Sequence, residues 1–291
     1  MSGIEPRPPL ALKAGLQIAT ALVRGLGPAR YALADAFGMV GYATSRRRRT
    51  NAARNHRRLE PGITMAEARR RARASFRAFA RSGVDFVWAC GLDAAAARRH
   101  SEWLPSMQRP VYLCQPGVQG VFALTHFGNW DMAANIAFSG GLKLTTVMAT
   151  TGPRAITDLV VWARRANQME VYEASHAAMG LIRAFRRGRY VAILCDLPEG
   201  GPTVTVDYCG GPVPFSSVPA WLALRAKVPL YPTACWYDDA RGIYLLHPME
   251  ALEVGPDDDE RSLMQRVAAA IEPVVRAHPE QWYPFREFYA D

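Results

Sequence analysis

An α/β fold is the fold class that the sequence predicts: a central, mostly parallel or mixed sheet flanked by helices, with a helical extension at the N-terminus. Three observations point to it. The 291 residues, of which 49% are hydrophobic, suffice for one large core. Segments with helical periodicity dominate residues 10–81 and alternate with apolar runs further on. Those runs are typical of buried strands and lie at residues 121–125, 143–149 and 190–195.

The N-terminal part of the chain predicts two helices over residues 10–44, with a break at residues 25–28. The first helix carries a continuous apolar stripe of Leu12, Leu16, Ala19 and Val23. Two interpretations remain open: the stripe packs against the core, or it lies in a bilayer surface. No segment reaches 18 uncharged apolar residues, so no membrane-spanning helix is expected. The N-terminal residues do not show the succession of charged, apolar and small residues that is typical of a signal peptide. We expect a membrane-associating extension over residues 1–50 and one domain over residues 51–291.

Arginine is concentrated in residues 46–81, which hold thirteen arginines against two acidic residues, Glu60 and Glu67. This local excess is larger than the +9 of the whole chain. A solvated helix face does not explain so one-sided a balance, so we expect this segment to face an anionic membrane surface. Nucleic acid is the competing partner, but no nucleic-acid-binding motif accompanies the arginines. Phe76 and Phe79 are expected to face inward from this helical segment.

Cysteine usage predicts neither a disulfide framework nor a zinc site, because the five cysteines are widely spaced and form no CxxC pair. A reducing, cytosolic setting fits this pattern. We therefore expect no metal site in the protein.

The central feature of the sequence is the segment between the strand at residues 121–125 and the helix that begins near Met132. His126 follows the strand, where open α/β sheets bind their ligands. Asn129 is a good N-cap, and Asp131 lies in the first helical turn, where the helix dipole favours a carboxylate. A carboxylate bonded to one ring nitrogen fixes the tautomer of a histidine and leaves the other nitrogen free as a base. The competing interpretation is a strand-end histidine beside a helix cap.

Residues 125–131, with the sequence THFGNWD, resemble the His-(T/S/F)-x-GNW-(E/D) signature of the lysophospholipid acyltransferase superfamily. The resemblance is to the branch of lipid A late acyltransferases and mycobacterial phosphatidylinositol mannoside acyltransferases. It continues in ordered blocks from about residue 55 to residue 286. These blocks are RNHRRL at 54–59, where His56 replaces the leucine of the family, VTVDYCGG at 204–211, residues 214–232, and PEQW at 279–282.

The resemblance implies acyl transfer from acyl-coenzyme A or an acyl carrier protein to a hydroxyl of a lipid or glycolipid. His126 would act as general base, oriented by Asp131 or by a second acid. It implies substrate contacts from Asn129, Trp130 and further residues, and it needs no cofactor. A non-catalytic lipid-binding relative and a thioester hydrolase are the alternatives. The implied location is peripheral, on the cytoplasmic face of the cell membrane.

The later elements supply the remaining candidate residues. A helix is expected over residues 156–169, and Arg164 near its end matches an arginine of the family; the alternative is a cation that complements the helix dipole. The strand at 190–195 ends in an acidic loop, where Glu199 is the candidate second acid and Asp196 is the alternative. If Glu199 is the second acid, Asp196 is expected to contact the substrate.

The C-terminal part of the chain predicts a small-residue loop before a helix, with Ser217 as N-cap rather than nucleophile, because no G-x-S-x-G motif surrounds it. Strands are expected near residues 111–113 and 242–247. An amphipathic helix over residues 263–277 is expected to be interrupted at Pro273.

Overall fold

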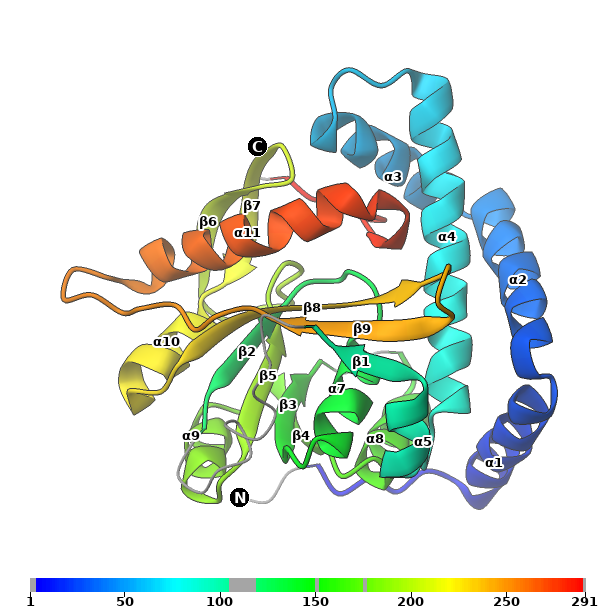
Figure 1. Ribbon diagram of the computed structural model, residues 1–291, viewed down its shortest axis with the longest axis horizontal. Helices are drawn as coiled ribbons and strands as arrows, with labels where there is room; N and C mark the ends of the chain where they lie inside the picture. The colour runs from blue at the N-terminus through cyan, green and yellow to red at the C-terminus, as the bar shows by residue number, and fades with distance from the viewer. Residues whose placement is uncertain (1–3, 105–118, 150–151, 175–176, 290–291) are drawn as a thin grey trace.

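A seven-stranded sheet lies at the centre of the computed structural model, which describes residues 4–104, 119–149, 152–174 and 177–289 (Figure 1). The strand order is β1-β9-β8-β2-β5-β3-β4. The five strands from β8 to β4 are parallel, β9 is antiparallel to β8, and β1 is parallel to β9. The sheet is therefore mostly parallel, and the predicted fold class is confirmed. The bounds are β1 Ser101–Trp103, β2 Val121–Leu124, β3 Leu144–Met148, β4 Glu170–Glu173, β5 Tyr190–Leu194, β8 Leu230–Asp238 and β9 Ile243–Pro248.

Helices cover both faces of the sheet, which is why β2 is buried along its whole length. The helices α9 (Ala178–Arg186), α10 (Val218–Ala226) and α11 (Glu260–Ala277) pack on one face with the hairpin of β6 (Thr203–Tyr208) and β7 (Gly211–Ser216). On the other face lie α7 (Trp130–Ser139) and α5 (Ala94–Arg99), with α8 (Arg154–Ala166) beside β4 at the edge of the sheet (Figure 1).

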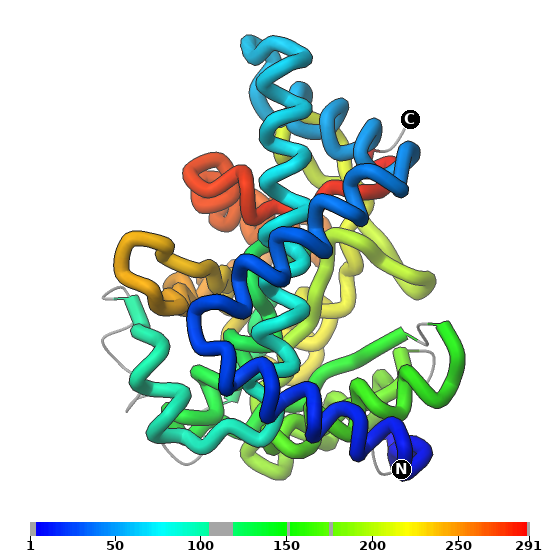
Figure 2. Tube along the Cα trace, turned by 90° about the vertical axis from the view of Figure 1, so that its right-hand side faces the viewer, coloured from blue at the N-terminus to red at the C-terminus, as the bar shows by residue number. Residues whose placement is uncertain are grey.

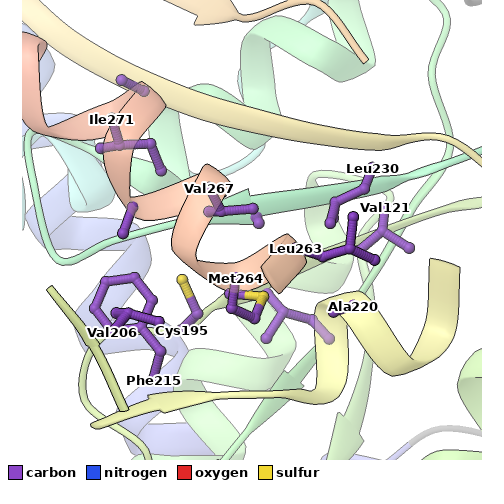
Figure 3. Close-up of a cluster of buried hydrophobic side chains, with 14 of the residues drawn as sticks. Val121, Cys195, Val206, Phe215, Ala220, Leu230, Leu263, Met264, Val267 and Ile271 are labelled. Atoms are coloured by element: carbon purple, nitrogen blue, oxygen red, sulfur yellow. The ribbon is translucent and has the colours of Figure 1, made fainter. Parts of the chain in front are cut away.

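The larger core cluster is formed where α11 meets the sheet and the hairpin (Figure 3). Leu263, Met264 and Val267 of α11 are fully buried beside Val121 of β2. The expected interruption of this helix at Pro273 is wrong, because α11 continues through it. An internal proline costs about 3 kcal/mol. The side chains of Ile271 and Val275, on either side of Pro273, are completely buried, and this burial offsets the cost.

The N-terminal helices α1 (Leu10–Gly25) and α2 (Arg30–Thr44) run along the outside of the long helix α4 (Met65–Trp88), joined by a 3-10 turn at Gly27–Ala29 (Figure 2). The break predicted at residues 25–28 is thus confirmed. The stripe of Leu12, Leu16, Ala19 and Val23 is half-buried, so it packs against the protein itself. Other large apolar side chains of the two helices and of Leu26 between them are exposed: Leu10, Ile18, Leu22, Leu26, Leu33, Phe37, Met39 and Val40.

Helix α3 (Arg46–Leu59) follows α2 and packs on α4. It runs across residue 50, where the sequence places the domain boundary; that division stays a prediction. None of the helices in the described ranges combines the length and the apolar character that crossing a bilayer requires.

Two expectations for this region and the sheet differ from the structure. Phe76 is buried as expected, but Phe79, three residues further along α4, is 46% exposed and lines a cavity described below. The sequence predicts a small-residue loop from residue 214 up to the helix, whereas the structure has the strand β7 there, paired with β6 in a two-stranded hairpin. Pro212 and Pro214 are tolerated because β7 is an outer strand. The strand expected near residues 111–113 lies outside the described residues.

Candidate active site

His126 and Asp196 follow neighbouring parallel strands at the same edge of the sheet. β2 and β5 pair in register, with Leu124 opposite Leu194. Each strand then continues for one residue before the two polar side chains, so the register itself sets His126 beside Asp196. This is the carboxyl edge of the parallel strands, where open α/β sheets bind their ligands.

The Asp196 carboxylate holds His126 through both its backbone and its ring. Oδ1 lies 2.8 Å from His126 Nδ1 and accepts a hydrogen bond from the His126 backbone N–H at 2.9 Å, and Oδ2 lies 3.0 Å from the same N–H. Asp196 is 1% exposed, whereas the His126 side chain is 27% exposed and lines a cavity. A carboxylate can only accept, so Nδ1 carries the proton and Nε2 is left unprotonated as a base.

Asp131 does not occupy this place, contrary to the sequence interpretation. Its carboxylate accepts two hydrogen bonds from Arg164, at 2.8 Å from Nε and at 3.2 Å from the terminal nitrogen NH2. Both side chains are about seven-eighths buried. Asp131 lies in the first turn of α7 and extends toward α8, while Asp196 comes beside His126 through the strand register. The carboxylate that orients His126 is therefore Asp196, and Arg164 is the partner of Asp131.

Glu199 does not contact the histidine either, although it lines the same cavity. It forms an ion pair with Arg286 at 2.8 Å, and both side chains are about half exposed. Gly200 and Gly201, both with positive φ, follow it and also line this cavity. The expectation that Glu199 lies beside His126 thus differs from the structure, in which Asp196 holds that place.

The loop after His126 has a fixed backbone. Gly128 has a φ of +61°, and a Cβ atom there would lie 1.8 Å from the carbonyl oxygen of Cys235. Only glycine fits this approach. The C-terminal segment closes over the same loop: the Gly128 N–H donates to the Gln281 carbonyl at 2.8 Å, and the Tyr283 hydroxyl donates to the Gly128 carbonyl at 2.8 Å.

Asn129 and Trp130 lie on opposite sides of this loop. Asn129 is 2% exposed, and its Oδ1 accepts from the Met132 N–H at 2.9 Å, which confirms the predicted N-cap. Asn129 is not among the residues that line the cavity at His126, so the expected substrate contact stays a prediction. Trp130 lines the cavity, with its ring 5.1 Å from the His126 ring.

The cavity at His126 has a volume of about 1160 Å³ and a mostly apolar lining. The sequence did not identify its wall, because the contributing side chains come from eight separate helices and strands. They include Phe79 and Phe86 of α4, Val160 of α8, Leu181 of α9, Ile193 of β5 and Trp221 of α10. A smaller apolar cavity adjoins it and shares Trp130, Asp131 and Arg164. Such a space suits an extended apolar ligand next to a base.

In the described parts of the chain, His, Cys, Asp and Glu do not gather in groups of three or more that could hold a metal ion.

Comparison with known proteins adds the following. The family model of bacterial lipid A biosynthesis acyltransferases matches residues 15–289. Phosphatidylinositol mannoside acyltransferase of Mycobacterium tuberculosis (strain CDC 1551 / Oshkosh) is 27% identical over 171 residues, 57% of this chain and 53% of that protein. Its counterpart in Mycolicibacterium smegmatis is 25% identical over 174 residues, 57% of this chain and 55% of that protein. The chain thus spans about half the length of the curated relatives it matches.

Among solved structures, the 1-acyl-sn-glycerophosphate acyltransferase PlsC from Thermotoga maritima aligns with a TM-score of 0.41 and 13% identity. The alignment covers 93% of this chain and 99% of that chain.

Proposed function

This chain belongs to the bacterial lipid A biosynthesis acyltransferase family, and from that premise we propose that it transfers a fatty acyl group from a thioester to a hydroxyl of a lipid or glycolipid. The observation that carries the proposal is the His126–Asp196 pair, 2.8 Å apart, at a cavity of about 1160 Å³ with a mostly apolar lining. The relatives named phosphatidylinositol mannoside acyltransferase support a glycolipid acceptor. Acyl-coenzyme A or an acyl carrier protein is the donor.

In the proposed mechanism, Nε2 of His126 takes the proton of the acceptor hydroxyl as its oxygen attacks the thioester carbonyl. The carbon–sulfur bond then breaks, and the proton on Nε2 passes to the departing thiolate. Asp196, held at Nδ1, stabilises the imidazolium between these two steps. A base so placed contributes about 10²–10⁴-fold to the rate. Asp131 and Arg164 line the cavity as a mutual ion pair and shape the wall against which the substrate lies.

We further propose that the protein works on the cytoplasmic face of the cell membrane as a peripheral protein. The exposed apolar side chains of α1 and α2 supply buried area in a bilayer surface, and arginines supply attraction to anionic lipid. Six arginines of α3 are exposed: Arg46, Arg47, Arg48, Arg54, Arg57 and Arg58. Cosedimentation with anionic vesicles should weaken as salt rises, since screening acts over about 8–10 Å at physiological ionic strength. Equal binding to neutral vesicles would contradict the electrostatic part.

The test of the proposed reaction begins with mass spectrometry of lipids that copurify with the protein. That lipid, or a lipid extract, is then incubated with acyl-coenzyme A or an acylated carrier protein. We expect acyl transfer in the wild type, its loss in His126→Ala, and unchanged transfer in the control His247→Ala, which alters a half-buried histidine of β9. Thiol release without a lipid acceptor would identify a hydrolase instead. Bound lipid with no turnover would identify a non-catalytic lipid-binding relative.

A further inference from the structure

A third cavity, of about 290 Å³, lies at the loop that follows His126. Gly128 and Asn129 line it, together with Tyr31 of α2, Asp85 of α4 and Tyr244 of β9. Asp85 is fully buried. A buried carboxylate is costly unless its oxygens are all used, so the partners of Asp85 indicate what this carboxylate holds in place.

Asp85 accepts hydrogen bonds from two separate elements. From α2, Arg30 Nε donates to Oδ1 at 3.0 Å and the Tyr31 hydroxyl donates to Oδ2 at 3.0 Å. From β9, the Tyr244 hydroxyl donates to Oδ2 at 2.5 Å. A hydroxyl has one proton, and the carboxylate can only accept. The Tyr244 oxygen is therefore left as an acceptor, and Asn129 Nδ2 donates to it at 3.2 Å.

Asn129 is fixed at both ends of its side-chain amide. Its Oδ1 caps α7 through the Met132 N–H, and its Nδ2 bonds Tyr244. The next two residues are Trp130, against the His126 ring, and Asp131, bonded to Arg164. The orientation of the Asn129 amide thus fixes the start of α7, whose first residues line the cavity at His126.

The series of hydrogen bonds from Asn129 through Tyr244 and Asp85 ends on α2, a helix with an exposed apolar face. Leu33, Phe37 and Val40 of α2 are 44%, 62% and 60% exposed. On its inner side α2 contacts α4 closely: a Cβ atom at Gly38 would lie 2.7 Å from the Arg77 backbone. Such direct backbone contact leaves little freedom for α2 to move without α4.

We propose that Asp85 and Tyr244 are positioning residues that orient Asn129, and that they connect α2 to the active-site loop so that seating of α2 on an anionic lipid surface stiffens residues 126–136. This regulation rests on the proposed function, whose reaction it would adjust. Neither residue touches the cavity at His126, so both act through the cap of α7.

The first test compares Tyr244→Phe with Tyr172→Phe. Tyr172 is a buried tyrosine of β4, at the opposite edge of the sheet, with its hydroxyl near Glu170 and Arg187. We expect Tyr244→Phe to lower kcat about ten-fold at unchanged KM and to raise hydrogen exchange in residues 130–136, because the Asn129 amide then keeps only its longer hydrogen bond, to the Ser82 carbonyl at 3.4 Å. Tyr172→Phe should change neither. Equal behaviour of the two variants would overturn the positioning role.

The second test uses vesicles of phosphatidylglycerol and phosphatidylcholine in equal parts. They should slow hydrogen exchange of residues 126–136 in the wild type. The double variant Arg30→Met/Tyr31→Phe, which removes both hydrogen bonds from α2 to Asp85, should still cosediment with the vesicles, because the exposed side chains of α2 are intact, but should lose this slowing. Vesicle binding without any change in exchange, or an equal change in both proteins, would overturn the connection through α2. Hydrogen exchange is measured without turnover of substrate. An absence of acyl transfer would therefore contradict the proposed function without changing the outcome of this exchange experiment.

Discussion

Replacing Asp196 by asparagine tests the assignment of the catalytic carboxylate, because it keeps the side-chain shape and removes only the charge and one acceptor. The carboxylate accepts from the backbone N–H of His126 with both oxygens and from Nδ1 with Oδ1. An amide has one oxygen and one NH2 group. If the oxygen stays at Nδ1, the NH2 group faces the backbone N–H. If the amide turns over, it donates to Nδ1 and drives the proton onto Nε2, which removes the base.

The expected loss follows from these two outcomes. Asp196 is 1% exposed, so water cannot replace the lost acceptor. A histidine held in the wrong tautomer loses about 10³–10⁴-fold in rate in enzymes with an oriented imidazole base. We therefore expect kcat to fall about 10³-fold, equivalent to about 4 kcal/mol of transition-state stabilisation, with KM nearly unchanged.

The assay is thiol release and acylated lipid formation with both substrates saturating, alongside thermal unfolding by circular dichroism. Asp131→Asn is the matched control, because it makes the same chemical change in a carboxylate bonded to Arg164 instead of to the histidine. We expect Asp131→Asn to lower kcat less than Asp196→Asn does. A folded Asp196→Asn variant within ten-fold of the wild-type rate, or the reverse order of the two variants, would refute the assignment.

Three further predictions concern other parts of the chain. His56 is buried, which lowers its pKa from 6.5 to about 3, and its Nδ1 has no partner among the described residues. The unfolded chain binds this proton below pH 6.5 and the folded chain does not, so the stabilisation is complete above pH 6.5 and is lost as the pH falls toward 3, by about 1.4 kcal/mol per unit. His56→Leu should flatten this slope in urea unfolding between about pH 7 and about pH 5; an unchanged slope would place the titrating group elsewhere. Glu199→Gln should change kcat by less than about three-fold, since exposed ion pairs contribute about 0–1 kcal/mol, and a larger loss than in Asp196→Asn would return the acid role to Glu199. Gly128→Ala should destabilise the protein by at least about 2 kcal/mol, because a Cβ atom would lie 1.8 Å from the Cys235 carbonyl oxygen at a φ of +61°; unaltered urea unfolding would contradict this loop geometry.

The sequence predicted the strands that carry the site and the residues at their ends. The apolar runs before His126 and Asp196 mark β2 and β5 because parallel strands are buried on both faces. It could not decide which carboxylate meets the histidine. That choice depends on the pairing of Leu124 with Leu194 and on the direction in which α7 leaves the loop, which are tertiary properties.

The residues that line the cavity at His126 could be predicted from the sequence even less well than the carboxylate. Phe79 was expected in the core from its helical position, because periodicity distinguishes only the two sides of a helix. In the structure the Phe79 ring contacts Tyr283 and Phe285, which lie about 200 residues later in the chain. Its surroundings therefore depend on the tertiary fold. Arg286 likewise has no local signal, since its partner Glu199 is 87 residues away.

The closure of the C-terminal segment over the catalytic loop has a consequence for biosynthesis. The backbone of residues 126–128 bonds to residues 281–283, and the Tyr283–Gly128 bond spans 155 residues. At a translation rate of about 5–20 residues per second, the loop is synthesised about 8–30 s before these partners. A nascent chain therefore carries His126 and Asp196 before the contacts that fix the backbone of residues 126–128, and a chain that ends before residue 281 lacks those contacts.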